Sequence, residues 1–206
     1  MVAKPTSQEK LSIEEVDLPQ AKIDQIMYCH GFASHFDPSK DKVRMLSQLA
    51  PVIGVTVDYT RHPMEVFEVF SQPLAQARQT LIVGTSMGGF YAAWLGSVLD
   101  LPFIAINPAI APSTSLRKHI GAGMTYFGSA FDLKAEIVDA YKDLPFRTSG
   151  QGQIVVDLGD EVIDSQATIT AVSNRLPVIT YPAGSHQFDH MREITAYLRK
   201  NFFIRK

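Results

Sequence analysis

The sequence predicts an α/β fold built on a doubly wound, mostly parallel β-sheet, with one small helical insertion over the sheet. Three observations carry this prediction: short apolar runs alternate with amphipathic segments, the runs are almost continuously apolar, and a single stretch breaks the alternation. Parallel strands covered by helices on both faces are apolar along their length, whereas half-exposed strands alternate. Regular strand–helix alternation is typical of consecutive βαβ units.

Six apolar runs are expected to form the strands. The runs at 80–85 (TLIVGT) and 153–158 (QIVVDL) are rich in β-branched residues, which favour strands. In chain order the expected strands are 24–29, 52–58, 80–85, 102–106, 153–158 and 176–181.

Helices are expected between these strands, because apolar residues recur there with helical spacing. Pro73 should end or kink the helix that precedes it, and Asp164 can cap the N-terminus of another. In chain order the expected helices are 39–50, 64–71, 87–98, 165–173 and 188–201.

Residues 108–150 interrupt the alternation. The stretch is rich in proline and glycine, and helix-like pieces occur only around 113–120 and 132–143. We expect it to form a lid or cap over one end of the sheet. The polar residues 1–22 are expected to form an N-terminal arm, followed by a single domain over 23–206.

Composition and charge argue against several classes of function. The 206-residue chain has a net charge of −2, which gives it no electrostatic reason to bind nucleic acid or an anionic membrane. Cys29 is the only cysteine, so neither an intrachain disulfide nor a cysteine zinc site is possible. The N-terminus lacks the apolar core of a signal peptide, and no run is long enough to span a membrane. We therefore expect a soluble, cytoplasmic protein.

The most informative motif is the run at 84–89 (GTSMGG), which fits the pattern G-x-S-x-G. It follows an expected strand and begins an expected helix, which is the context of a nucleophile elbow. Small residues must flank Ser86 because the strand and helix approach closely in this turn. At background residue frequencies the pattern arises by chance only about 0.07 times in a chain of this length. Ser86 is therefore predicted to be a nucleophile.

A serine nucleophile needs a base, and the base needs an acid that orients it. In this type of elbow fold the acid and then the histidine follow the serine along the chain. His186, in a loop of small residues after the last expected strand, is the predicted base, with His190 as the alternative. Asp160, the first carboxylate after its strand, is the predicted acid.

Two other carboxylates, Glu161 and Asp164, remain alternatives for the acid. His186 and His190 also have the spacing of a metal pair on a helix, but no third ligand is evident, so no metal site is predicted.

An acyl-transfer site also needs donors for an oxyanion, usually two backbone N–H groups. The residue after the serine, Met87, is expected to supply one, and Phe32, in the loop after the first strand, the other. His30, in the same loop, is expected to be a buried histidine that connects neighbouring loops. The expected substrate pocket is lined by Phe32, Ala33, Phe36, Met124, Tyr126 and Phe127.

Together these motifs resemble the small bacterial YqiA/YcfP-type esterases of the α/β-hydrolase superfamily, and the resemblance runs from about residue 24 to 200. The stretches that carry it are 30–32 (HGF), 84–89 (GTSMGG), 107–108 (NP), 159–164 (GDEVID) and 184–186 (GSH). The resemblance implies an abbreviated α/β-hydrolase fold without the first strands of larger relatives. It also implies activity on small acyl esters and a triad of Ser86, Asp160 and His186.

The sequence thus favours a serine carboxylesterase that acts on a small-molecule ester through an acyl-enzyme, without metal or cofactor. A thioesterase, amidase or acyltransferase on the same triad is the alternative among enzymes. A non-catalytic ligand-binding protein with the same fold is the alternative from another class.

Overall fold

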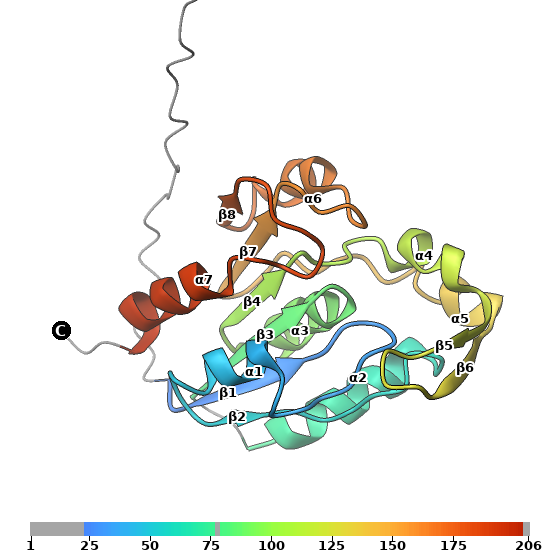
Figure 1. Ribbon diagram of the computed structural model, residues 1–206, viewed down its shortest axis with the longest axis horizontal. Coiled ribbons are helices and arrows are strands. Elements are labelled where there is room, and N and C mark those ends of the chain that lie inside the picture. The colour runs from blue at the N-terminus through green and yellow to red at the C-terminus, as the bar shows by residue number, and fades with distance from the viewer. Residues whose placement is uncertain (1–22, 77–78, 204–206) are drawn as a thin grey trace, which may run out of the picture.

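The centre of the computed structural model, which describes residues 23–76 and 79–203, is a six-stranded parallel sheet (Figure 1). Its strand order is β2-β1-β3-β4-β7-β8, and every neighbouring pair is parallel. The strands are β1 (Gln25–Cys29), β2 (Val52–Ile53), β3 (Thr80–Thr85), β4 (Phe103–Ile106), β7 (Gly152–Asp157) and β8 (Val178–Tyr181).

Helices cover both faces of this sheet, because successive strand residues point to opposite sides. In β1, Ile26 and Tyr28 join the core under α1 and α7, whereas Met27 and Cys29 join the core under α2, α3 and α6. The sheet is therefore doubly wound, as predicted. The helices are α1 (Asp41–Leu46), α2 (Pro63–Ser71), α3 (Met87–Leu99), α6 (Ser165–Val172) and α7 (Met191–Leu198).

The order of the strands reverses at β1. The chain moves from β1 to β2 on one side and then returns to place β3 on the other. The loops after β1 and β3 therefore run in opposite directions from the carboxyl edge of the sheet and leave a crevice between them. Doubly wound folds bind their ligands in such a crevice.

Most predicted elements are confirmed, and three differ markedly in extent. The expected helix 39–50 is only α1 (Asp41–Leu46), because the chain after Leu46 continues in turns, in which Leu49 N donates to Leu46 O (2.9 Å). The expected strand 52–58 keeps only two residues in the sheet, because the chain then turns so that Val57 N donates to His30 Nε2 (3.0 Å). The expected helix 188–201 begins at Met191, because Phe188 has a φ of 62° and Asp189 N donates to the buried Asp157 (2.8 Å).

Both helix-end predictions hold. α2 ends at Ser71, and Pro73 lies in the 3₁₀ turn Gln72–Leu74 that follows. Asp164 caps α6 by accepting a hydrogen bond from Ala167 N (2.9 Å). After α7 the chain continues in one π-helical turn, Arg199–Phe203.

The insertion is only partly helical. It contains α4 (Pro112–Ser115), a 3₁₀ turn (Arg117–His119), an antiparallel hairpin of β5 (Gly121–Met124) and β6 (Ala130–Leu133), and α5 (Ala135–Asp139). The sequence reasoning did not predict the hairpin. Its strands are short, and Gly123 lies under the ring of Phe131, where a Cβ would be 2.3 Å from the ring.

The proposed N-terminal arm, residues 1–22, lies outside the described residues. Among the helices of the described part of the chain, none has the length and apolarity that a membrane span requires.

Candidate active site

Ser86 lies in a sharp turn between β3 and α3, with a φ of 56° and a ψ of −120°. Non-glycine residues rarely adopt a positive φ, and such strain is typical of functional turns. The flanking glycines are required for steric reasons: a Cβ at Gly84 would lie 2.0 Å from the carbonyl oxygen of Gly88, and a Cβ at Gly88 would lie 2.0 Å from that of Cys29. The motif therefore allows β3, α3 and the end of β1 to meet beneath the serine.

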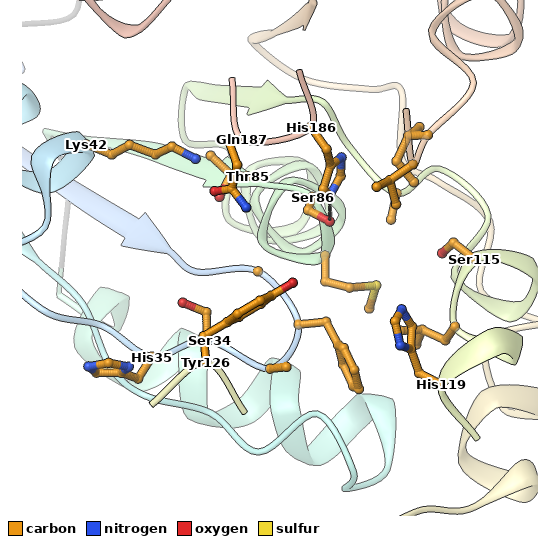
Figure 2. A pocket seen from close by; sticks show the side chains of 18 of the residues that line it. Ser34, His35, Lys42, Thr85, Ser86, Ser115, His119, Tyr126, His186 and Gln187 are labelled. Atoms are coloured by element: carbon orange, nitrogen blue, oxygen red, sulfur yellow. Dashed lines mark hydrogen bonds between the residues drawn. The ribbon is translucent and has the colours of Figure 1, made fainter. Parts of the chain in front are cut away.

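The structure brings the three predicted triad residues into one line. His186 Nε2 lies 3.0 Å from Ser86 Oγ (Figure 2). On the other side of the ring, His186 Nδ1 lies 2.8 Å from Asp160 Oδ2. An ionised carboxylate can only accept hydrogen bonds, so Nδ1 donates to Asp160. In the neutral ring Nε2 is then left as an acceptor facing the serine hydroxyl. This is the arrangement that general-base catalysis requires.

Asp160 is held as a buried carboxylate, with only 2% of its side chain exposed. Burial by itself would raise its pKa. Hydrogen bonds from His186 and from the N–H groups of Ile163 and Val162 (2.8 Å each to Oδ1) outweigh burial and lower the pKa below its ordinary value. The carboxylate is therefore ionised at neutral pH and can stabilise a protonated His186.

The alternative acids and the alternative base lie elsewhere. Glu161 accepts a hydrogen bond from the backbone N–H of His186 (3.0 Å), not from its ring. Asp164 is used as the cap of α6. His190 donates its Nδ1–H to Asp157 (2.7 Å) and stacks on Tyr181 (ring centroids 4.7 Å apart). None of them faces Ser86.

Asp157, at the end of β7, supports the loop that carries His186. Its fully buried carboxylate accepts hydrogen bonds from Asp189 N (2.8 Å), Ser185 N (3.3 Å) and His190 Nδ1 (2.7 Å). Asn107 adds a second connection, because Nδ2 donates to Ser185 O (3.0 Å) and Oδ1 accepts from Asp157 N (2.8 Å). Sequence reasoning missed this role. The signal was a carboxylate inside an otherwise apolar strand.

The two predicted oxyanion donors flank the serine. Met87 begins α3 directly after Ser86, and the loop at Gly31 lies over the turn, where an added Cβ would be 3.5 Å from the Ser86 Cβ. Within the described residues, neither Phe32 N nor Met87 N donates a hydrogen bond. Both N–H groups are thus available beside the nucleophile.

His30 connects two loops, as expected. Its Nδ1–H donates to Gly31 O (2.8 Å), and its Nε2 accepts from Val57 N (3.0 Å). Burial lowers the pKa of His30 to about 4, so the ring is neutral at physiological pH. It holds the loop of Phe32 in place and does not contact Ser86.

A cavity of about 630 Å³ opens onto Ser86 and His186. Four of the expected pocket residues line it: Phe32, Ala33, Met124 and Tyr126. Sequence reasoning missed Leu116, His119 and Phe131, which the insertion brings into the cavity. The rings of His119 and Phe131 lie 5.1 and 5.3 Å from that of Phe32.

Two expected pocket residues lie elsewhere, and their assignment is corrected. Phe36 packs against the core under α1 and α7, with its ring over Gly54. Phe127 contacts His35 (ring centroids 4.4 Å apart) and lines a neighbouring cavity that does not include Ser86. Both errors arise because aromatic residues near a site in sequence can pack to either side of a loop.

Comparisons with known proteins agree with this fold. The sequence model of the family described as "Uncharacterised protein family (UPF0227)" matches residues 25–201. A UPF0227 protein of Shewanella loihica is 25% identical over 182 residues, covering 84% of this chain and 97% of the relative.

Among solved structures, Est1E from Butyrivibrio proteoclasticus superposes with a TM-score of 0.67 and 15% identity, covering 89% of this chain and 90% of that one. The monoacylglycerol lipase of Paleococcus ferrophilus gives a TM-score of 0.64 at 10% identity, covering 86% and 94%. These likenesses establish the α/β-hydrolase fold.

Proposed function

This chain belongs to the family UPF0227, and we propose that it is a serine hydrolase that cleaves small carboxylic esters through an acyl-enzyme. The observation that carries the proposal is the line from Ser86 Oγ to His186 Nε2 (3.0 Å) and from His186 Nδ1 to Asp160 (2.8 Å), at the edge of a cavity. A binding protein gains nothing from holding a hydroxyl, an imidazole and a buried carboxylate in this order.

In the proposed first step His186 Nε2 takes the proton of Ser86 while the serine oxygen attacks the ester carbonyl carbon. The tetrahedral oxyanion forms beside Phe32 N and Met87 N, which would donate hydrogen bonds to it. The ester C–O bond then breaks, and His186 gives the proton to the leaving alcohol. Asp160 keeps the ring in the required tautomer and stabilises its protonated form.

In the second step a water molecule replaces the alcohol. His186 takes a proton from the water as it attacks the acyl-enzyme, and the proton returns to Ser86 as the acid leaves. The cavity volume of about 630 Å³ falls in the usual range for small-molecule sites. The name of one neighbouring solved structure, a monoacylglycerol lipase, favours esters over other acyl compounds.

Hydrolysis of p-nitrophenyl acetate, butyrate and octanoate tests the proposal. Saturable turnover of at least one ester is expected, and Ser86→Ala should lower kcat on the order of 10⁴-fold or more. Ser97→Ala removes a serine from the far end of the same helix and should leave the rate unchanged.

Acyl-CoA substrates of matched chain length belong in the same assay. Faster turnover of the thioesters would mean that the protein is a thioesterase that uses the same triad. Equal rates for Ser86→Ala and the unmodified protein would overturn the nucleophile assignment.

A further inference from the structure

The cavity beside Ser86 has a charge opposite to that of the whole chain. The net charge of the chain is −2. Yet Lys40, Lys42 and Lys118 line this cavity, and the only carboxylate among its lining residues is Asp41. Asp41 is largely exposed (85% of its side chain) and lies 3.6 Å from Arg44. A cavity with this balance favours a negatively charged ligand.

Lys42 is the lysine placed to act at the reacting centre. It is half-buried on α1, and Figure 2 shows its side chain reaching from that helix towards Thr85 and Gln187, next to Ser86. Within the described residues its ammonium group makes no hydrogen bond or ion pair. Lys40, two residues earlier, differs: its Nζ donates to Ser34 Oγ (3.1 Å) and is close to His35 O (3.4 Å).

The two carboxylates whose charges act on Lys42, those of Asp157 and Asp189, already accept other hydrogen bonds. Burial lowers the pKa of Lys42 to about 8, and the negative charges of Asp157 and Asp189 limit this shift. Asp157 is bonded to His190 and to two backbone N–H groups, and Asp189 accepts from Ser185 Oγ (3.1 Å). Lys42 therefore remains mostly protonated at neutral pH, and a half-buried charge without a partner is costly.

Neutral donors line the same cavity as the ammonium group. The hydroxyl groups of Tyr28 and Thr85 lie 3.0 Å apart, and one of them donates to the other. Burial raises the pKa of Tyr28 to about 12, so both hydroxyl groups keep their protons. The hydrogen bond between them uses one of the two protons, and the other can be donated to a ligand. The side-chain amide of Gln187, which lines the same cavity, makes no hydrogen bond within the described residues.

We propose that Lys42, Thr85 and Gln187 form an anion subsite, and that the preferred substrates are esters with a carboxylate or phosphate group close to the ester bond. This inference rests on the proposed ester hydrolysis. The uncharged part of such a substrate would lie against apolar residues that line the same cavity, such as Met87, Leu116 and Phe131. A carboxylate and a phosphate share the chemistry that the subsite recognises, namely negative oxygens that accept several hydrogen bonds.

Matched substrates test the subsite. The neutral ester methyl 4-acetoxybenzoate, its carboxylate twin 4-acetoxybenzoate and the phosphate analogue 4-acetoxyphenyl phosphate are hydrolysed in a pH-stat at neutral pH. At least one anionic ester is expected to exceed the neutral one in kcat/KM, and the better of the two identifies the anion. Lys42→Met should lower kcat/KM for the anionic ester about 10- to 100-fold and that for the neutral ester less than about twofold.

Two further variants separate recognition from general charge. Arg44→Met removes one positive charge from the same helix at a solvent-facing position and should leave the preference intact. Lys42→Arg keeps the charge and should retain most of the preference. Equal losses for the neutral and anionic esters in Lys42→Met would overturn the proposal, because Lys42 would then only support the fold or the loop of His186.

A binding measurement distinguishes failure of the subsite from failure of the proposed function. Titration calorimetry with 4-hydroxybenzoate, 4-hydroxyphenyl phosphate and neutral methyl 4-hydroxybenzoate requires no turnover. If no ester is hydrolysed, tighter binding of an anion that is lost in Lys42→Met still supports the subsite. Binding that does not depend on charge or on Lys42 rejects it.

Discussion

The two carboxylate oxygens of Asp160 have different functions at this site. Its Oδ1 accepts the backbone N–H groups of Val162 and Ile163, and its Oδ2 accepts the ring N–H of His186. The first oxygen fixes the position of the side chain, and the second fixes the tautomer of the base. The two functions can be separated by a substitution that preserves shape.

Asp160→Asn is expected to lower kcat for ester hydrolysis by about 10³- to 10⁴-fold while KM changes little. The asparagine oxygen can still accept both backbone N–H groups, but its NH₂ then faces His186 Nδ1. The ring must accept there, so Nε2 becomes a donor that cannot take the proton of Ser86. Steady-state kinetics on the best p-nitrophenyl ester measures the effect.

Asp164→Asn is the matched control, four residues further along, where asparagine caps α6 as well as aspartate does. It should leave both kcat and the unfolding midpoint near those of the unmodified protein. A larger loss of kcat in Asp164→Asn than in Asp160→Asn would contradict the assignment of Asp160 as the triad acid.

The predictable residues are those whose chemistry depends on local order along the chain. Ser86 is recognisable because its turn has room only for glycine at the adjacent positions 84 and 88. His186 is recognisable because it follows the last strand. The role of Asp157 was harder to predict, because the three groups that donate hydrogen bonds to it belong to a loop about 30 residues later. Phe36 and Phe127 were placed wrongly, since which side of a loop an aromatic ring packs on depends on tertiary contacts.

At the scale of elements, His30 joins the loop after β1 to the chain that leaves β2. Its buried neutral ring donates to Gly31 and accepts from Val57. The folded pKa of about 4 is below the ordinary value of 6.5, so between these pH values the unfolded state binds more protons. Stability must therefore fall as the pH is lowered through this window.

Between pH 6.5 and 4, His30 should remove about 3 kcal/mol from the free energy of unfolding. His30→Gln offers an acceptor to Val57 but does not titrate, so this part of the pH dependence should disappear. Urea unfolding of both proteins at several pH values measures it: the stability difference between them should shrink towards pH 4. Parallel stability–pH curves would show that burial does not hold His30 neutral.

Elements with regular patterning were predictable, and irregular ones were not. The central strands and α3 match their apolar runs, because an element that is buried on all sides needs apolar residues along its whole length. β2 is cut short by a side chain, His30, that replaces the neighbouring strand as hydrogen-bonding partner. The hairpin of β5 and β6 is stabilised by Phe131 lying across Gly123, a contact that no periodicity reveals.

At the scale of the whole molecule, the parallel sheet brings distant segments together. The loops after β1, β3, β7 and β8 all leave the same edge of the sheet, and they carry Phe32, Ser86, Asp160 and His186 in turn. The carboxyl ends of parallel strands lie at one edge of a sheet, so the gathering of these loops was predictable once the strands were expected to be parallel. The insertion that covers them shapes one side of the cavity, and its fold depends on contacts within itself.

The most direct measurement of the central claim, that folding activates Ser86, is covalent labelling with a fluorophosphonate followed by peptide mass spectrometry. In the folded protein we expect a stoichiometric adduct on Ser86, abolished in His186→Gln and absent from protein unfolded in urea. An adduct on another serine, or no adduct at Ser86 in the folded protein, would contradict the account.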